Sequence, residues 1–135
     1  MVGLDFGNIN FMEKALDAAM LKNNVIANNI ANVDTVGFKK SEVRFDEILK
    51  DSIYNQKLQG LITNSKHIPI GVPSLNDIKP QVIKDNNTSM RLDGNNVDID
   101  AEMSNLAKNQ LYYNAIVQRV NGELTSIMTA VKDGR

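Results

Sequence analysis

The residues whose types could support chemistry are few in this chain, and their spacing favours structural roles. His67 is the single histidine, and the 135 residues include no cysteine. Metal sites and general bases draw on clusters of such groups, so His67, with no carboxylate pair nearby, is interpreted as a structural or solvated loop residue. The sequence also has no glycine-rich phosphate loop and no nucleophile elbow. It therefore predicts no catalytic residue, no metal, no cofactor and no small-molecule substrate.

Acidic residues gather just before the second of two long helical patterns. Asp98 and Asp100 could be imagined as a catalytic acid and base. Their place before a helix instead favours capping of its free N–H groups and complementing its dipole. The stretch Asp93–Asn96 superficially resembles a calcium loop, but it lacks the ligand spacing and the final glutamate of an EF-hand. We predict that Asp93 and Gly94 form a turn and that Asp98 caps the helix.

Charge and hydropathy exclude two classes of partner. The formal net charge is -1, so the chain has no excess of positive charge with which to attract a nucleic acid. No apolar run approaches the ~20 residues that a membrane span needs, and the first residues do not read as a secretory signal. Taken alone, these features suggest a soluble cytoplasmic protein.

Two segments carry the apolar periodicity of long helices. Their spacings alternate between three and four residues, which is the seam pattern of a coiled coil, so we expect the helices to pack on each other antiparallel or nearly so. The first runs from about Asn8 to Val33, with a stripe of Ile9, Met12, Leu16, Ala19, Asn23, Ile26, Ile30 and Val33. The second runs from about Ile99 to Val131, with a stripe of Ile99, Met103, Leu106, Gln110, Tyr113, Val117, Val120, Leu124, Ile127 and Val131.

The chain between these helices has a different character. Residues 41–56 could form a short amphipathic helix, whereas Pro69, Pro73 and Pro80 exclude a continuous helix or a central strand from residues 57–97. We expect an extended loop there, with one or two short strands. The predicted fold is mainly α and forms a single domain, residues 1–135. Helices within 1–36 and 98–135 form a packed, coiled-coil-like hairpin, and residues 37–97 form the connecting arm.

Apolar side chains outside the two stripes indicate an assembly. They include Phe11, Ala15, Ala18, Met20, Leu21 and Val25 on the first helix and Leu111, Tyr112, Ile116 and Met128 on the second. With no third long helix to cover them, we expect another molecule to do so, the alternative being an ordinary monomeric bundle. Five asparagines also lower the propensity of the first helix by about 3 kcal/mol in total. We therefore predict that the isolated chain has partly disordered termini that order on assembly.

The most informative motif is the stretch Ala27–Lys39, ANNIANVDTVGFK. The helix ends here, and Gly37 can adopt a positive φ. The asparagine carboxamides can donate and accept at a subunit interface, although a solvated polar face is the alternative. The stretch resembles the N-terminal signature of flagellar rod, hook and hook-filament-junction proteins: an Ala-Asn-Asn-Ile-Ala-Asn run followed by Thr, Gly, an aromatic residue and Lys. Many members have proline where this chain has Val36.

A second group of motifs resembles the proximal rod subunits within that family. It comprises DGNNVDID at 93–100, Glu102-Met103 and NQLY at 109–112, and Thr63 to Ile68 also fits. The resemblance implies a structural subunit that assembles helically through its terminal helices and transmits motor torque. The implied partners are copies of itself, other rod subunits, and adaptor proteins of the base ring and export gate. It also implies export through the flagellar type III apparatus without a cleaved signal peptide, which replaces the cytoplasmic inference.

Other functions remain open beside that one. They are a sister rod subunit, or a soluble coiled-coil adaptor or export chaperone. For the rod subunit, the predicted subunit-interface residues are Leu16, Ala19, Asn23, Ile26, Asn28, Asn29, Ile30 and Asn32 on the first helix and Leu106, Tyr113, Val117, Val120, Leu124 and Ile127 on the second. The predicted turn and cap residues are Gly37, Asp93, Gly94 and Asp98.

Overall fold

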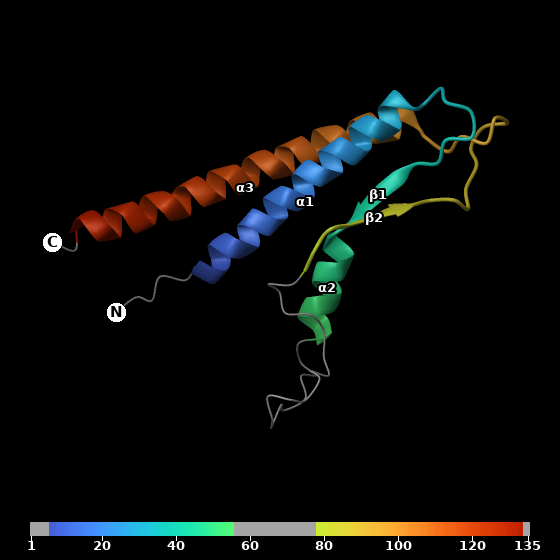
Figure 1. Ribbon diagram of the computed structural model, residues 1–135. Coiled ribbons are helices and arrows are strands. Elements are labelled where there is room, and N and C mark those ends of the chain that lie inside the picture. Colours follow the sequence, from blue (N-terminus) through green and yellow to red (C-terminus); the bar gives the residue numbers. More distant parts are fainter. Residues whose placement is uncertain (1–5, 56–77, 134–135) are drawn as a thin grey trace.

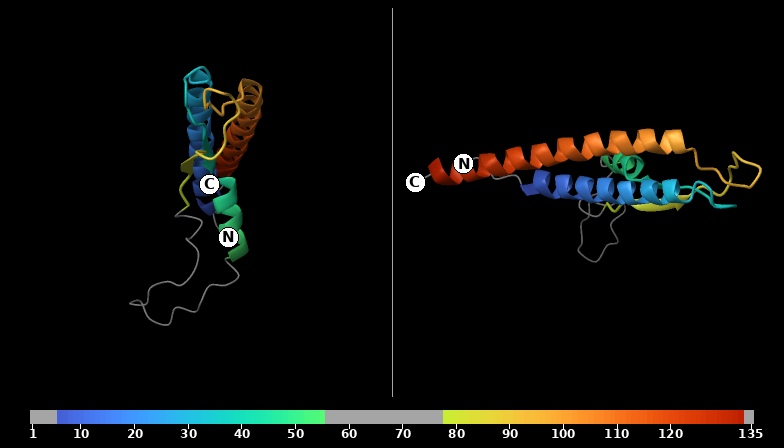
Figure 2. Two further views of the ribbon diagram at one scale, coloured as in Figure 1. Left: turned by 90° about the vertical axis from the view of Figure 1, so that its right-hand side faces the viewer. Right: turned by 90° about the horizontal axis from the view of Figure 1, so that it is seen from above.

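Two long antiparallel helices dominate the computed structural model, which describes residues 6–55 and 78–133 (Figure 1). Helix α1 spans Phe6–Ala31, and helix α3 spans Ile99–Asp133. They lie side by side along the length of α1, and α3 continues beyond the residue at which α1 begins (Figure 2). The mainly α fold with packed terminal helices, predicted from the apolar periodicity, is confirmed.

The arm contains a two-stranded antiparallel sheet and a short helix. Strand β1, Ser41–Arg44, pairs with β2, Gln81–Lys84, and helix α2 spans Asp46–Asn55 between them. The helix expected from residue 41 thus begins later, because Ser41 and Val43 alternate inward as strand residues. Its first turn carries Asp46 and Glu47, which complement the helix dipole. A strand was expected after residue 57, and β2 confirms it. Within that expected loop, residues 57–77 lie outside the described part of the chain.

The apolar core lies between α1 and the arm. Ala15 and Ala18 on α1 are buried against Phe45 and Ile78, with Val43, Ile48, Leu49 and Ile116 packed around them. The prediction that another molecule covers Ala15 and Ala18 is wrong. Because the arm folds back along α1, Phe45 and Ile78 cover these alanines within the same chain (Figure 1).

The side of α3 that faces α1 also differs from the predicted stripe. Glu102 and Asn109 are buried there, and Ile116 packs against the core. These three residues are seven apart, so they lie on one side of the helix. In contrast, Ile99, Met103, Leu124 and Val131, all members of the predicted stripe, are exposed. The inner face of α3 thus differs in part from the predicted stripe. Polar residues with hydrogen-bond partners occupy part of it, whereas the stripe members Leu106, Tyr113 and Val120 are half-buried.

Two glycines are expected to respond in opposite directions to replacement by alanine. Gly122 lies inside α3 with nothing within 4 Å of an added Cβ. Gly122→Ala should therefore stabilise the chain by up to about 1 kcal/mol. Gly94 has φ +83°, where a side chain is strained, so Gly94→Ala should destabilise it by about 1 kcal/mol or more. Urea unfolding followed by circular dichroism measures both, and equal effects of the same sign would contradict the expectation.

Candidate functional site: a joint of buried asparagines and an open helix flank

Three asparagines are the largest fully buried side chains among the described residues. They are Asn29, Asn95 and Asn96, each exposed by 1% or less. Asparagine is mostly found at protein surfaces, so burial of three requires nearly complete hydrogen bonding. We call these three residues the asparagine joint, because they connect the end of α1, the beginning of α3 and the two strands.

Asn95 holds the turn that follows α1. Its Nδ2 donates to the backbone carbonyls of Asn32, Val33 and Thr35, at 3.1, 2.9 and 2.9 Å. Its Oδ1 accepts a hydrogen bond of 2.7 Å from the N–H of Val97. Backbone carbonyls in a turn need partners outside regular secondary structure. A side chain that precedes α3 therefore fixes the chain just after α1.

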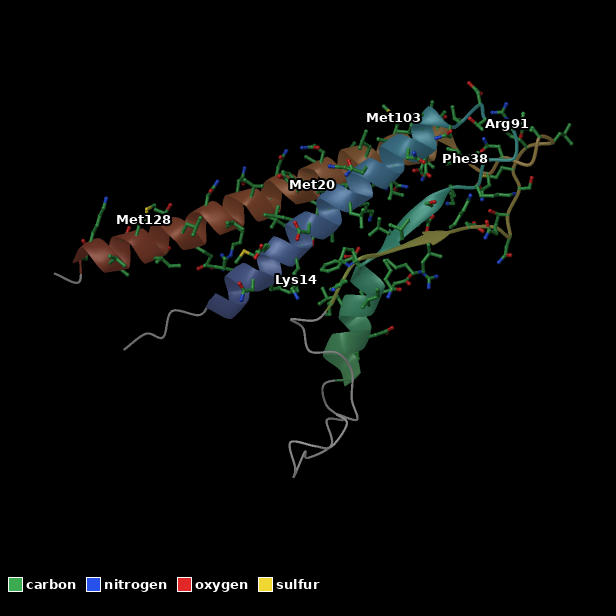
Figure 3. All side chains as sticks on the ribbon, viewed as in Figure 1. Lys14, Met20, Phe38, Arg91, Met103 and Met128 are labelled. Atoms are coloured by element: carbon green, nitrogen blue, oxygen red, sulfur yellow. The ribbon has the colours of Figure 1, made fainter. Side chains whose placement is uncertain are left out.

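Arg91 adds a positive charge at the same helix end. Its Nη1 donates to the carbonyl of Val33 at 3.1 Å and lies 3.4 Å from a carboxylate oxygen of Asp34. A cation here complements the negative end of the helix dipole. Figure 3 shows Arg91 and Phe38 in this end region of the molecule, away from Met128.

Asn96 fixes the chain just before β1 and just after β2. Its Oδ1 accepts from the N–H of Lys40 at 2.7 Å, and its Nδ2 donates to the carbonyl of Asp85 at 3.0 Å and the hydroxyl of Thr88 at 2.8 Å. The Thr88 hydroxyl in turn donates to the Asp85 carboxylate at 2.7 Å. This hydrogen bond is the main reason that the pKa of Asp85 lies below its ordinary value.

Asn29 joins α1, β1 and α3 through one carboxamide. Its Nδ2 donates to the carbonyl of Ser41 at 2.8 Å and to Oε2 of Glu102 at 2.9 Å. Its Oδ1 accepts from the N–H of Ser41 at 3.0 Å. The side chain thus pairs with both backbone groups of Ser41, as a neighbouring strand would. Asn29 belongs to the Ala27–Lys39 motif, so this motif fixes the arm to both long helices.

A second polar contact lies farther along the helix pair. Asn109 on α3 donates from Nδ2 to the carbonyl of Ala19 at 2.7 Å and to Oδ1 of Asn23 at 2.8 Å. Asn23 was the polar member of the predicted stripe on the first helix, and Asn109 is its partner. A buried polar pair of this kind fixes the register of two helices.

The turn before α3 is built from backbone and carboxylate contacts. The carbonyl of Asp93 accepts from the N–H of Gly37 at 2.9 Å, and both Gly37 and Gly94 have positive φ, +71° and +83°. At the start of α3, Oδ1 of Asp98 accepts from the N–H groups of Asp100 and Ala101 at 3.0 and 3.3 Å. Asp98 therefore caps the helix in the geometry of an N-cap.

The structure distributes the predicted interface residues over several environments, and their role between subunits stays a prediction. Those buried within the chain are Ala19, Ile26 and Asn29. Those half-buried are Leu16, Asn23, Ile30, Asn32, Leu106, Tyr113, Val117, Val120 and Ile127, and those exposed are Asn28 and Leu124. Sequence reasoning assigned no contact to Asn95, Asn96, Glu102 or Asn109. All four belong to the motifs that carried the family resemblance. Membership in these motifs was the one feature of the sequence that could have marked them as structurally important.

One flank of α3 carries apolar side chains that the described residues leave largely exposed. Its exposed members are Ile99, Met103, Leu124, Met128 and Val131, with half-buried Val117 in the same row. Their spacings, combinations of three, four and seven residues, place them on one side of the helix, and the exposed polar residue Gln110 interrupts the row between Met103 and Val117. We call this row the open flank of α3. Met103 and Met128 lie toward its two ends (Figure 3). Exposed apolar side chains grouped in this way are typical of surfaces that bind another protein.

The described residues offer little for other kinds of site. Within 6–55 and 78–133, no group of three or more His, Cys, Asp or Glu side chains could hold a metal ion. None of the helices described is both long and apolar enough to span a bilayer. The joint and the open flank are thus the features from which a function can be argued.

Replacing Asn95 with alanine tests the joint. Asn95→Ala should destabilise the chain by about 2–3 kcal/mol, because three carbonyls in the turn after α1 lose the donor that the buried Asn95 side chain supplies. Urea unfolding of the purified chain measures this loss. Asn86→Ala is the matched control, since Asn86 is exposed and lies in the same arm. Equal effects of the two substitutions would show that Asn95 has no special role.

Comparison with known proteins identifies relatives along nearly the whole chain. A family described as flagella basal body rod protein matches residues 9–39, which comprise most of α1 and the turn that follows it. The flagellar basal body rod protein FlgB of Bacillus subtilis (strain 168) is 37% identical over 129 residues, covering 96% of each chain. FlgB of Borrelia hermsii is 36% identical, covering 93% of this chain and 96% of its own. FlgB of Proteus mirabilis (strain HI4320) is 36% identical, covering 92% and 93%.

Proposed function

The chain belongs to the family of the flagellar basal body rod protein FlgB, and from this premise we propose that it is a structural subunit of the proximal rod. The family is one of structural rod proteins, and no catalytic role is proposed. In this role the chain assembles helically with its neighbours and helps to transmit motor torque.

The observation that carries the proposal is the open flank of α3. Its apolar residues lie at the two ends of the helix, Ile99 and Met103 at one end and Leu124 to Val131 at the other, with polar Gln110 between them. In a monomer, such a row would remain in water at a cost of roughly 25 cal/mol per Å². Lateral packing of neighbouring subunits removes it from water. In a rod, each subunit has lateral neighbours, and a neighbour that packs along α3 would cover these apolar side chains.

The asparagine joint suits a mechanical role. Asn29, Asn95 and Asn96 together bond to both long helices and to the segments next to both strands. Directional hydrogen bonds resist rotation more than apolar contacts do, because each fixes an angle as well as a distance. The joint therefore holds the arm at one orientation to the helix pair, so that a load applied to one reaches the other.

The finer features of the proposal concern partners and delivery. We propose copies of the chain and other rod subunits as lateral partners, and adaptor proteins of the base ring and export gate at the proximal end. We also propose export through the flagellar type III apparatus. The family membership and the unpartnered flank support these assignments.

Electron microscopy of isolated basal bodies tests the proposal. Density for the chain is expected in the proximal rod, and a strain that lacks it should be non-motile with basal bodies that have no complete rod. A motile deletion strain with complete rods would refute the function. Density elsewhere in the rod would indicate a sister subunit. A small stable oligomer confined to the cytoplasm would indicate an adaptor or export chaperone.

A further inference from the structure

The carboxylate of Glu102 is buried but incompletely bonded. The residue lies in the first turn of α3 and is only 4% exposed. Its Oε2 accepts from Nδ2 of Asn29 at 2.9 Å. Within the described part of the chain, no hydrogen bond or ion pair reaches its Oε1. A carboxylate can accept about four hydrogen bonds, and a buried charge is costly unless it is paired. The missing partner of Oε1 is therefore unfavourable in the isolated chain.

Glu102 lines a pocket between α1, β1 and α3. The pocket has a volume of about 200 Å³, and its polar wall includes Ser41, Glu42 and Asn105 besides Glu102. This is room for several water molecules or for the end of a long side chain. Two carboxylates in the wall disfavour an anion. Val25, Ile26 and Val43 form an apolar part of the same wall.

The nearby cations of this chain form no hydrogen bond or ion pair with Glu102 among the described residues. Lys40 pairs with Glu42 at 2.7 Å, and this hydrogen bond is the main reason that the pKa of Lys40 is raised, with a smaller electrostatic contribution from Glu102. Lys22 lies in the pocket wall, yet no ion pair connects it to Glu102 in this part of the chain. The hydrogen-bonding capacity of Oε1 is thus unused within the described residues, although Lys40 attracts the carboxylate from a distance.

We propose, on the basis of the rod-subunit function, that this pocket receives a lysine or arginine side chain of an adjoining rod subunit. Its charged N–H groups bond to Oε1 of Glu102 and its aliphatic stem packs on Val25 and Val43. Long basic side chains combine these two properties, since the stem is apolar and the head is charged. A bare metal ion would instead need several converging oxygen ligands, and no group of three or more His, Cys, Asp or Glu side chains in the described ranges could hold one.

The test compares two strains whose chains lose one carboxylate each. Glu102→Gln keeps an oxygen that can accept from Asn29 but removes the charge, and Glu47→Gln removes an exposed carboxylate outside the pocket. The amount of each chain in isolated basal bodies is measured by quantitative mass spectrometry. We expect Glu102→Gln to be reduced at least about tenfold, as for loss of one charge-assisted hydrogen bond, with Glu47→Gln unchanged. Incorporation of Glu102→Gln within about twofold of the wild type would overturn the proposal.

A measurement on the purified chain separates assembly from folding. Glu102→Gln should unfold at the same or a higher urea concentration than the wild type, since it buries no charge. If Glu102→Gln unfolds at a lower urea concentration, a binding measurement on the folded wild-type chain replaces the strain comparison. The chain is titrated with n-butylammonium, a lysine mimic, and separately with tetramethylammonium, which has no N–H group, while the amide signals are followed by NMR spectroscopy. Saturable shifts of the Glu102 and Ser41 amide signals with n-butylammonium alone support binding of a basic side chain in the pocket. Equal responses to both ions overturn it.

The strains also distinguish this proposal from the rod function itself. If the wild-type chain is absent from basal bodies, both fail together. If the wild-type chain is present and Glu102→Gln is incorporated equally well, the chain remains a rod subunit and only the pocket assignment fails.

Discussion

Leu124→Asp is expected to abolish rod assembly and motility while the chain itself still folds. Leu124 is 44% exposed in the open flank of α3, beyond the part of the helix that contacts the core. A charge there changes the free energy of unfolding by less than about 1 kcal/mol, because water still reaches it in the monomer. In a subunit interface the unpaired carboxylate would be buried, which costs several kcal/mol at each contact. Swimming in soft agar and electron microscopy of basal bodies measure the outcome.

Ser126→Asp is the matched control for this substitution. Ser126 is exposed on the same helix, and two residues of helical rotation place it on the side away from Leu124. The same charge on the same turn should therefore leave motility intact. Complete rods and wild-type swimming in the Leu124→Asp strain would show that the open flank is not an assembly surface. A loss of helix in the purified variant would instead assign the defect to folding.

Asn29→Asp is expected to be the most destabilising single exchange in the joint. The new carboxylate would occupy the position of Nδ2, which lies 2.9 Å from Oε2 of Glu102 and 2.8 Å from the carbonyl of Ser41. Two buried carboxylates would then face each other, and Ser41 would lose its donor. We expect a loss of about 3–5 kcal/mol at neutral pH, a large part of the stability of a domain. Urea unfolding monitored by circular dichroism gives the value.

A double-mutant cycle identifies the cause of this loss. If repulsion by Glu102 causes it, Asn29→Asp should destabilise the Glu102→Gln chain much less than it destabilises the wild type. Asn28→Asp is the control, because Asn28 is the exposed neighbour on the same helix turn. If the substitutions at positions 28 and 29 cost the same, or if the loss at position 29 is unchanged in the Glu102→Gln chain, the contact with Glu102 does not determine it.

The long helices could be predicted from the sequence because their signal is local. The expected ranges, about Asn8 to Val33 and Ile99 to Val131, differ from the observed Phe6–Ala31 and Ile99–Asp133 by about two residues at the ends. A short strand after residue 57 was predicted, but its position was not. The residues of β2, Gln-Val-Ile-Lys, do not alternate between apolar and polar, and the strand with which β2 pairs lies about forty residues earlier.

The joint could be predicted only in part, because its burial depends on contacts distant in sequence. Asn95 is buried by the end of α1, some sixty residues before it. Composition alone places an asparagine at the surface, and the first interpretation of the Ala27–Lys39 motif placed its carboxamides between subunits or in water. The capping role of Asp98 and the positive φ of Gly37 were easier to predict from the sequence, since each depends on neighbouring residues.

Among the described residues, the two long helices differ in length and end in a step (Figure 2). Helix α3 has 35 residues and α1 has 26, a difference of 35 − 26 = 9 residues. At 1.5 Å per residue this corresponds to a step of roughly 13 Å. In the proposed rod, such a step favours overlap between successive copies over contact along a flat plane. With that overlap, a cross-section of the rod would cut continuous helix as well as contacts between subunits, so twisting the rod would also deform helices.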